Sequence, residues 1–294
     1  MKSYLKPKRK IRKMNNENKG DFRRKTEILP KKYILFALFF LIYALIENKF
    51  LLCTRHEYFG KDIKIAHISD IHKRKFGKNN SRICEKIRRE SPDIILITGD
   101  VVSRTETDFS SVESMLKELC GISPVCMIFG NHEQTLPPDM KKNFIEAVDR
   151  TGAVLLRNKS AYIEINGHKL HIYGLEERET VYKNGKSYRN LDRITLSDME
   201  TLLGRCSGSN TILLAHNPFF CDVYSQWGAE YTLSGHVHGG IARIFGKGLL
   251  SPERKLFPPF SKGVYNSGRM KLLVSGGLGK FRLFNPPEIV IYRI

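Results

Sequence analysis

The sequence lacks several features that would place it in common classes of protein. Its six cysteines form no C-x-x-C pair and show no zinc-ligand spacing, which argues against a cysteine-held zinc site. No internal repeat and no low-complexity segment is present. No small-residue cleavage site follows its one long apolar run, which argues against a cleaved signal peptide. The 294 residues leave room for one large domain or two small ones.

Acidic residues are scarce at the start of the chain. Residues 1–32 carry thirteen Lys and Arg against three Asp and Glu, a net charge of +10, whereas the other 262 residues carry +9. This segment has too few apolar side chains to bury a core, so we predict a basic disordered tail over 1–32. No nucleic-acid partner is expected, because the segment that follows suggests a different reason for the charge.

An uncharged apolar run of fourteen residues, 33–46, follows the tail. A membrane-spanning helix needs about 20 residues, and the run reaches that length only by continuing through Glu47 and Lys49 to Cys53. We predict an uncleaved transmembrane anchor over 33–53, with a buried globular helix as the alternative. The basic residues before the run predict a cytoplasmic tail and a domain over 54–294 outside the cytoplasm. The expected location is therefore the cell membrane, crossed once.

From Ile63 onward, strand-like and helix-like stretches alternate. Apolar runs predict strands over 63–68, 93–98, 125–129, 153–156, 162–165, 169–173, 211–215 and 231–233. Helices are predicted over 79–89, 111–119 and 137–149. Asn166-Gly167, between two of the strands, predicts a hairpin turn. The alternation is typical of an α/β sheet, in which ligands bind at the carboxyl ends of the strands.

Two histidines follow the last of these strands. His236 and His238 are two residues apart, so in an extended chain their side chains point to the same face. Alone, such a pair is weak evidence for a metal site. Four other strands also end in polar residues of the kinds that bind metals or move protons, namely Asp70 with His72, Asp100, Asn131 with His132 and Glu133, and His216. Five such blocks at five strand ends together predict a metal site.

In their order, these blocks resemble the motifs of the calcineurin-like metallophosphoesterase family. The resemblance covers residues 63–294, and the flanking Gly239-Gly240 and 274–279 look most like its bacterial membrane-anchored branch. It implies a four-layer α/β/β/α sandwich of two mixed sheets. It also implies two divalent metal ions, for which imidazole, carboxylate and amide ligands suit Mn, Fe or Zn. One ion would be held by Asp70, His72, Asp100 and His238, and the other by Asp100, Asn131, His216 and His236, with Asp100 bridging.

The activity implied by the resemblance is hydrolysis of a phosphodiester, pyrophosphate or phosphomonoester bond, by in-line attack of a hydroxide between the two ions. His132 would donate a proton to the leaving oxygen, while Glu133 would support its loop. Phosphoprotein phosphatases of the superfamily carry an Asp three residues after the bridging Asp. Here that residue is Ser103, which argues against a phosphoprotein substrate, and the next residue, Arg104, is a candidate phosphate contact. His67 and Trp227 are expected to pack in the core.

A segment punctuated by Gly and Pro, 241–269, follows the histidine pair and mixes basic with aromatic residues. We predict that it forms one wall of the active site and that Arg254 and Lys255 contact the substrate. Because exposed aromatic and basic residues suit a membrane interface, a phospholipid or lipid-linked pyrophosphate is a candidate substrate. No obligate protein partner is indicated. Two alternatives remain open, a catalytically weak metal-binding module on the same fold and a nuclease.

Overall fold

The structure is a computed structural model that describes residues 31–57, 62–185, 187–280 and 282–294. The chain divides into two units, 1–40 and 41–294. The predicted basic tail lies outside the described residues, except for Lys31 and Lys32, which begin helix α1 (Lys31–Glu47). The apolar side chains of α1 within the first unit are almost all exposed.

Helix α1 ends within the segment 33–53, over which an anchor was predicted. Within the described residues, no helix is long and apolar enough to cross a membrane. The helix ends at Glu47, whose carboxylate accepts a hydrogen bond from the backbone N–H of Phe284 at 2.7 Å. Asn48 donates its side-chain amide to the carbonyl oxygen of Ala44, and the chain then forms strand β1 (Leu52–Glu57). The helix therefore ends at the polar residues Glu47 and Asn48, and Cys53 belongs to a sheet.

The first sheet of the second unit has six strands in the order β1-β14-β2-β3-β4-β5. Among the described strand pairs of this sheet, β14–β2 is antiparallel and the others are parallel, so the sheet is mixed. Its strands after β1 are β2 (Lys64–Ile68), β3 (Ile94–Ile97), β4 (Val125–Met127), β5 (Val154–Leu155) and β14 (Glu288–Arg293).

The second sheet has six strands in the order β12-β13-β9-β8-β7-β6, and it is also mixed. Its strands are β6 (Lys159–Ile165), β7 (His168–Gly174), β8 (Thr211–Leu214), β9 (Tyr231–Ser234), β12 (Gly263–Ser267) and β13 (Met270–Val274). The predicted hairpin is confirmed, because Asn166 and Gly167 join β6 to β7 with φ angles of 50° and 76°.

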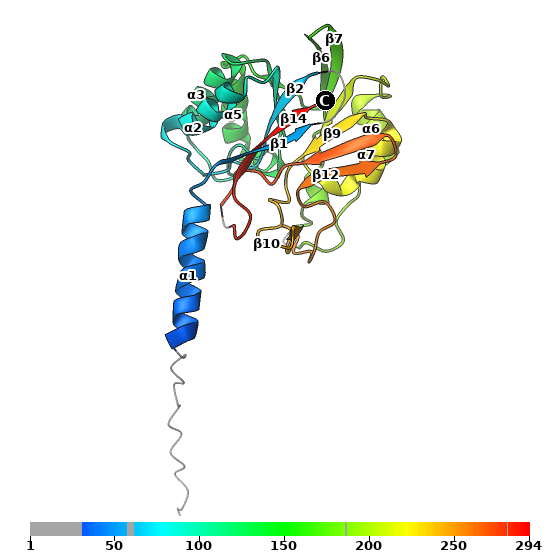
Figure 1. Ribbon diagram of the computed structural model, residues 1–294. Coiled ribbons are helices and arrows are strands. Elements are labelled where there is room, and N and C mark those ends of the chain that lie inside the picture. The colour runs from blue at the N-terminus through cyan, green and yellow to red at the C-terminus, as the bar shows by residue number, and fades with distance from the viewer. Residues whose placement is uncertain (1–30, 58–61, 186, 281) are drawn as a thin grey trace, which may run out of the picture. The chain divides into compact units, whose positions relative to one another are not determined.

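Helices cover the outer face of each sheet, as Figure 1 shows. The first sheet is covered by α2 (Ser81–Glu90), α3 (Ser110–Cys120) and α5 (Pro138–Asp149), and the second by α6 (Leu196–Leu203) and α7 (Cys221–Trp227). The short elements are α4 (Asn131–Gln134), η1 (Lys78–Asn80), η2 (Glu179–Val181), η3 (Pro218–Phe220), β10 (Arg243–Ile244) and β11 (Lys247–Gly248). The predicted four-layer sandwich of two mixed sheets is confirmed.

Strand β3 shows why the sequence forms buried layers. Ile94 and Leu96 pack into the core between the two sheets, whereas Ile95 and Ile97 pack under the helices. A strand that is buried on both faces has a continuous apolar sequence instead of an alternating one. The predicted core positions of His67 and Trp227 are also confirmed, since both side chains are buried.

Phe144 on α5 offers a test of this packing. Its buried ring lies 5.3 Å from the ring of Phe109 and 5.8 Å from that of Phe129, measured between ring centroids. Phe144→Ala should lower the free energy of unfolding by about 3–5 kcal/mol, because it leaves a cavity under the sheet. The neighbouring Asn143→Ala is exposed and should change it by less than about 0.5 kcal/mol. Urea denaturation would measure both, and equal midpoints for the two variants would contradict the assigned packing.

Candidate metal centre

Polar residues that follow five strands meet at one edge of the sandwich. Their donor atoms form three groups, each with all atoms within 4.8 Å of one another: Asp70 with His72 and His238; Asp70 with Asp100 and His216; and His72 with Asp100 and His132. Asp70 and Asp100 occur in two groups each, so the groups form one cluster. Both carboxylates and the imidazole of His216 are almost completely buried.

The backbone is unusual at this cluster. Five residues predicted as metal ligands have left-handed φ angles, namely Asp70 at 55°, His72 at 52°, Asp100 at 54°, His236 at 68° and His238 at 53°. Such conformations are costly for residues with a Cβ and persist where the surrounding structure enforces them, most often at functional sites. The unusual backbone therefore coincides with four residues of the cluster and with His236, which lines the adjoining cavity.

Gly235 lets the segment after β9 come close to the segment after β2. A Cβ at Gly235 would lie 1.8 Å from Oγ of Ser69 and 2.6 Å from Oδ2 of Asp70. The absence of a side chain lets the backbone N–H of His236 reach the Asp70 carboxylate, at 3.1 Å from Oδ2. The segment after β9 is thereby fixed against the segment after β2.

Asp100 lies at the centre of the cluster. Its Oδ2 atom is 3.5 Å from Nε2 of His216 and 3.8 Å from Nε2 of His72, and its Oδ1 accepts the backbone N–H of His132 at 2.8 Å. Burial opposes ionisation of Asp100, but the surrounding imidazoles hold its pKa well below its usual range. Burial likewise opposes charging of His216, yet Asp100 raises the pKa of His216 to about 10.

Glu133 supports the cluster without joining it. Its buried carboxylate accepts backbone N–H groups from Asp100 at 2.8 Å, Gly130 at 2.8 Å and Val102 at 3.0 Å. Burial and the charge of Asp100 raise the pKa of Glu133 to about 7, against the effect of these donors. Glu133 therefore ties the end of β3 to the start of α4, in agreement with the structural role expected for it.

Two buried polar atoms without partners show that the cluster fits metal ions. Nδ1 of His216 donates to the carbonyl oxygen of Thr98 at 2.6 Å, so Nε2 is the nitrogen that remains to bind a cation. That Nε2 and Oδ1 of Asn131 are both buried without a hydrogen-bond partner among the described residues. Leaving buried polar atoms unsatisfied is costly, and a divalent cation would bind Oδ1 of Asn131 directly and Nε2 of His216 in place of its proton. The His and Asp groups are thus consistent with a dinuclear metal centre.

His236 makes a contact that the sequence did not reveal. Its Nε2 hydrogen-bonds the carboxylate of Glu253, and both side chains are buried. Burial opposes ionisation of Glu253, but His236 lowers its pKa to about 2. With Nε2 donating to Glu253, Nδ1 is the nitrogen left to bind a ligand. Glu253 lies inside the 241–269 segment, where no motif or spacing marks it, so only the fold could identify it.

His132 is held as a neutral imidazole. Its Nδ1 accepts the backbone N–H of Arg104 at 3.2 Å, and its ring centroid lies 4.4 Å from that of His72. Burial lowers the pKa of His132 to about 4. The proton of the neutral ring therefore sits on Nε2, which is free to donate it. Phosphoprotein phosphatases of the superfamily have an aspartate where this chain has Ser103. Here the backbone N–H of Arg104 orients the His132 ring.

A cavity of about 200 Å³ opens onto the cluster. It is smaller than the ~300–1,000 Å³ typical of sites for drug-sized ligands, so it suits a phosphoryl group and its nearest substituents. Its walls are formed by Asp100, Arg104, Asn131, His132, Thr135, Glu179, Tyr182, Lys183, Tyr188, His236, His238, Pro252 and Glu253. Pro252 and Glu253 bring the 241–269 segment into the wall.

The predicted substrate contacts lie at different places around this cavity. Arg104 lines it, together with Lys183, which the sequence had not singled out. Arg254 and Lys255 are not among its lining residues. The Arg254 guanidinium lies 5.4 Å from the ring centroid of Tyr188, and the Lys255 ammonium lies 4.7 Å from that of Phe219. A substrate-binding role for any of these cations stays a prediction.

Comparison with known proteins agrees with the chemistry of the cluster. Residues 63–240 match the family model of the calcineurin-like phosphoesterases. An uncharacterized metallophosphoesterase of Campylobacter jejuni is 29% identical over 248 residues, covering 80% of this chain but only 59% of the relative. One of Aquifex aeolicus is 28% identical over 242 residues, covering 80% of this chain and 86% of the relative. The phosphodiesterase YaeI of Escherichia coli is 25% identical over 244 residues, covering 79% and 82%.

The contact between Glu253 and His236 gives a test of the centre. Glu253→Gln keeps the size of the side chain but removes the charge that orients His236, so metal affinity should fall about 10- to 100-fold. Calorimetric titration of metal-free protein with Mn²⁺ or Zn²⁺ would measure the change. The exposed Glu200→Gln on α6 is the matched control and should bind metal like the unmodified protein. If both variants retain full affinity, Glu253 does not position a ligand.

Proposed function

The chain belongs to the calcineurin-like phosphoesterase family, and we propose that it is a two-metal hydrolase of phosphodiester, pyrophosphate or phosphomonoester bonds. It is a metallophosphoesterase, a hydrolase of phosphoester bonds. The observation that carries the more specific proposal is the cluster around Asp100, in which buried imidazoles and carboxylates meet two buried polar atoms that have no hydrogen-bond partner among the described residues.

Each residue of the cluster has a role in this proposal. Asp70, His72 and His238 would hold one ion; Asn131, His216 and His236 would hold the other; and Asp100 would contact both. When bound, two such ions supply an activated nucleophile and offset the charge of the attacking and leaving oxygens. The mixed nitrogen and oxygen donors favour Mn, Fe or Zn.

Cationic side chains at the cavity would bind the phosphoryl oxygens. Arg104 and Lys183 line the cavity and lie on separate segments, after β3 and after η2. Arg104 offers a planar fork of donors suited to a phosphate, and Lys183 offers a point charge. Two cations at a small cavity would hold the phosphoryl group in one orientation over the cluster.

His132 would donate a hydrogen bond to the leaving oxygen from Nε2. Because Arg104 donates its N–H to Nδ1, the ring acts as a neutral donor and not as an imidazolium. A neutral imidazole is a weak acid, so its contribution should depend on how much proton donation the leaving group needs. Substrates with a poor leaving group, such as alkyl diesters, should therefore depend on it most.

We propose a phosphoester as the substrate, without assigning a particular compound. The name of the Escherichia coli relative, a phosphodiesterase, favours a diester. A membrane-borne phosphoester and a location outside the cytoplasm stay predictions from the sequence.

The leaving group provides the test of this function. The full chain, loaded with Mn²⁺, should hydrolyse bis-p-nitrophenyl phosphate, which loses p-nitrophenolate, and glycerophosphocholine, which loses an alkyl alcohol, and chelation should abolish both activities. His132→Asn should lower the rate for an alkyl leaving group by about 10²- to 10⁴-fold. It should have a much smaller effect on p-nitrophenolate, which leaves without a proton.

His168→Asn, at the edge of the β6–β7 hairpin, is the matched control and should leave the rates unchanged. An equal loss across leaving groups in His132→Asn would show that the residue serves structure and not proton donation. Hydrolysis that persists after complete metal removal would contradict the function itself.

A further inference from the structure

A second and larger cavity, of about 1060 Å³, lies outside the metal centre. Four segments distant in sequence form it: the end of α1 with Asn48 and Lys49, residues 73–76 with Arg82, residues 241–242, and Lys280 with Arg282 and Leu283. None of the predicted metal ligands lines it. The phosphoesterase chemistry described above therefore leaves this cavity without a role.

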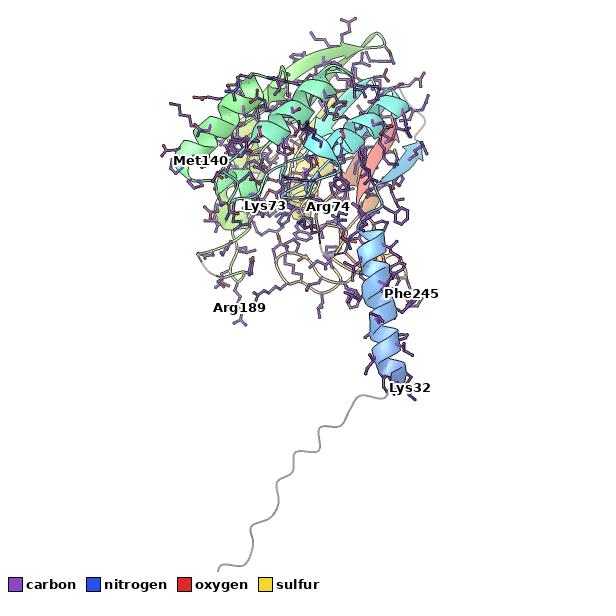
Figure 2. The ribbon with its side chains drawn as sticks, turned by 90° about the vertical axis from the view of Figure 1, so that its left-hand side faces the viewer. Lys32, Lys73, Arg74, Met140, Arg189 and Phe245 are labelled. Carbon is purple, nitrogen blue, oxygen red and sulfur yellow. The ribbon has the colours of Figure 1, made fainter. Side chains whose placement is uncertain are left out.

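The charged groups of this cavity are all of one sign. Its lining contains seven basic residues and no Asp or Glu, namely Lys49, Lys73, Arg74, Lys75, Arg82, Lys280 and Arg282. Figure 2 shows Lys73 and Arg74 side by side. Like charges brought together repel one another, so such a set is most stable when it pairs with an anion.

Arg282 has two buried donor atoms for which the described residues offer no acceptor. It is 2% exposed, and its Nε donates to the carbonyl oxygen of Gly279 at 2.7 Å. Its Nη1 and Nη2 atoms are buried with no hydrogen-bond partner among the described residues. An unpaired buried guanidinium is costly, and a phosphate or carboxylate is the group that its two parallel donors fit best.

Apart from Asn48, the rest of the cavity is apolar, and the surface around it is too. The apolar lining residues are Leu41, Ala44, Leu45, Phe76, Ile241, Ala242 and Leu283. A backbone bridge between Ala242 and Leu283, and the 4.9 Å separation of the Tyr43 and Phe284 rings, join these segments into one surface.

Large apolar side chains are exposed along the same segments. Leu45 is 59% exposed, Phe50 58%, Phe284 45%, and Phe245 is completely exposed (Figure 2). Exposed apolar residues that are gathered on one surface mark a contact with another apolar phase. Combined with Lys and Arg, they are typical of surfaces that bind anionic lipid.

We propose that this cavity binds an anionic membrane lipid, with its phosphate on the basic residues and its acyl chains along the apolar wall. Residues 1–32 carry a net charge of +10, the same sign as the lining, so their charge does not complement this cavity. A nucleic acid would satisfy the cations but would leave the apolar wall exposed. The inference does not require the proposed hydrolysis, since no catalytic residue takes part in it.

The cavity lies next to the metal centre. Arg74 and Arg282 both donate to the carbonyl oxygen of Gly279. A Cβ on Gly279 would lie 3.2 Å from Nδ1 of His238 and 3.3 Å from Cδ2 of His72. One peptide segment therefore separates the two sites, and lipid bound in the cavity would hold the metal centre close to a lipid surface.

Lipid crosslinking from inside the cavity would test this proposal. Ile241→p-benzoylphenylalanine places a photoreactive ketone on the cavity wall of the full chain. The probe is a vesicle of phosphatidylcholine and phosphatidylglycerol in equal amounts, and mass spectrometry measures which lipid is attached. We expect phosphatidylglycerol to be favoured by about tenfold or more, since each nearby Lys or Arg contributes about fivefold.

Three exposed lysines of the lining are then changed together, as Lys49→Gln, Lys75→Gln and Lys280→Gln. This variant should lose most of the preference for phosphatidylglycerol while it hydrolyses bis-p-nitrophenyl phosphate at the unmodified rate. The matched control carries Lys142→Gln, Lys159→Gln and Arg205→Gln, which are exposed and outside this cavity. It loses the same charge and should keep the preference.

Several results would overturn the proposal. Equal attachment of the two lipids in the unmodified lining would show that the anionic head group is not recognised. An equal loss in both triple variants would show a general effect of charge. Displacement of the lipid by inorganic phosphate, or by an oligonucleotide, would assign the cavity to that ligand instead. If the unmodified protein prefers phosphatidylglycerol but does not hydrolyse bis-p-nitrophenyl phosphate, the result would count against the proposed function and not against the lipid site.

Discussion

The buried carboxylate of Asp100 is the group on which the rest of the site depends. It lies between imidazoles that come from the ends of different strands, and it also accepts the backbone N–H of His132. A buried carboxylate is tolerated only where positive charge and donors surround it. Both sheets are needed to supply them, since His72 follows β2 of the first sheet and His216 follows β8 of the second. The sandwich thus brings together groups that no single sheet could collect.

This constraint explains the strained backbone nearby. Left-handed φ angles at Asp70, Asp100 and His236 cost of order 1–3 kcal/mol each, and the packed cores of the sandwich hold them in place. The supporting contacts come from residues with no ligand role. Glu133 fixes the turn after β3, Gly235 allows close approach of two loops, and Glu253 orients His236. The packed cores and these supporting contacts therefore maintain the geometry of the site.

Much of this could be predicted from the sequence, for a physical reason. Strands such as β3 and β8 are buried on both faces, so they appear as uninterrupted apolar runs, and polar residues at their ends mark the site. Other features arise only from tertiary contacts. β1 and β14 pair across more than 230 residues, Glu253 meets His236 through an irregular segment, and the basic cavity is assembled from four distant pieces. The anchor over 33–53 was predicted by continuing the apolar run 33–46 through Glu47 and Asn48, whereas in the structure these two residues form hydrogen bonds at the end of the helix.

The central claim is that two metal ions share Asp100, and anomalous diffraction tests it most directly. Crystals of the protein grown with Mn²⁺ would be measured above the manganese edge. The account predicts two anomalous peaks about 3.5–4 Å apart, with the Asp100 carboxylate between them and Nε2 of His216 and Oδ1 of Asn131 facing the same ion. A single peak, or peaks that do not contact Asp100, would contradict it.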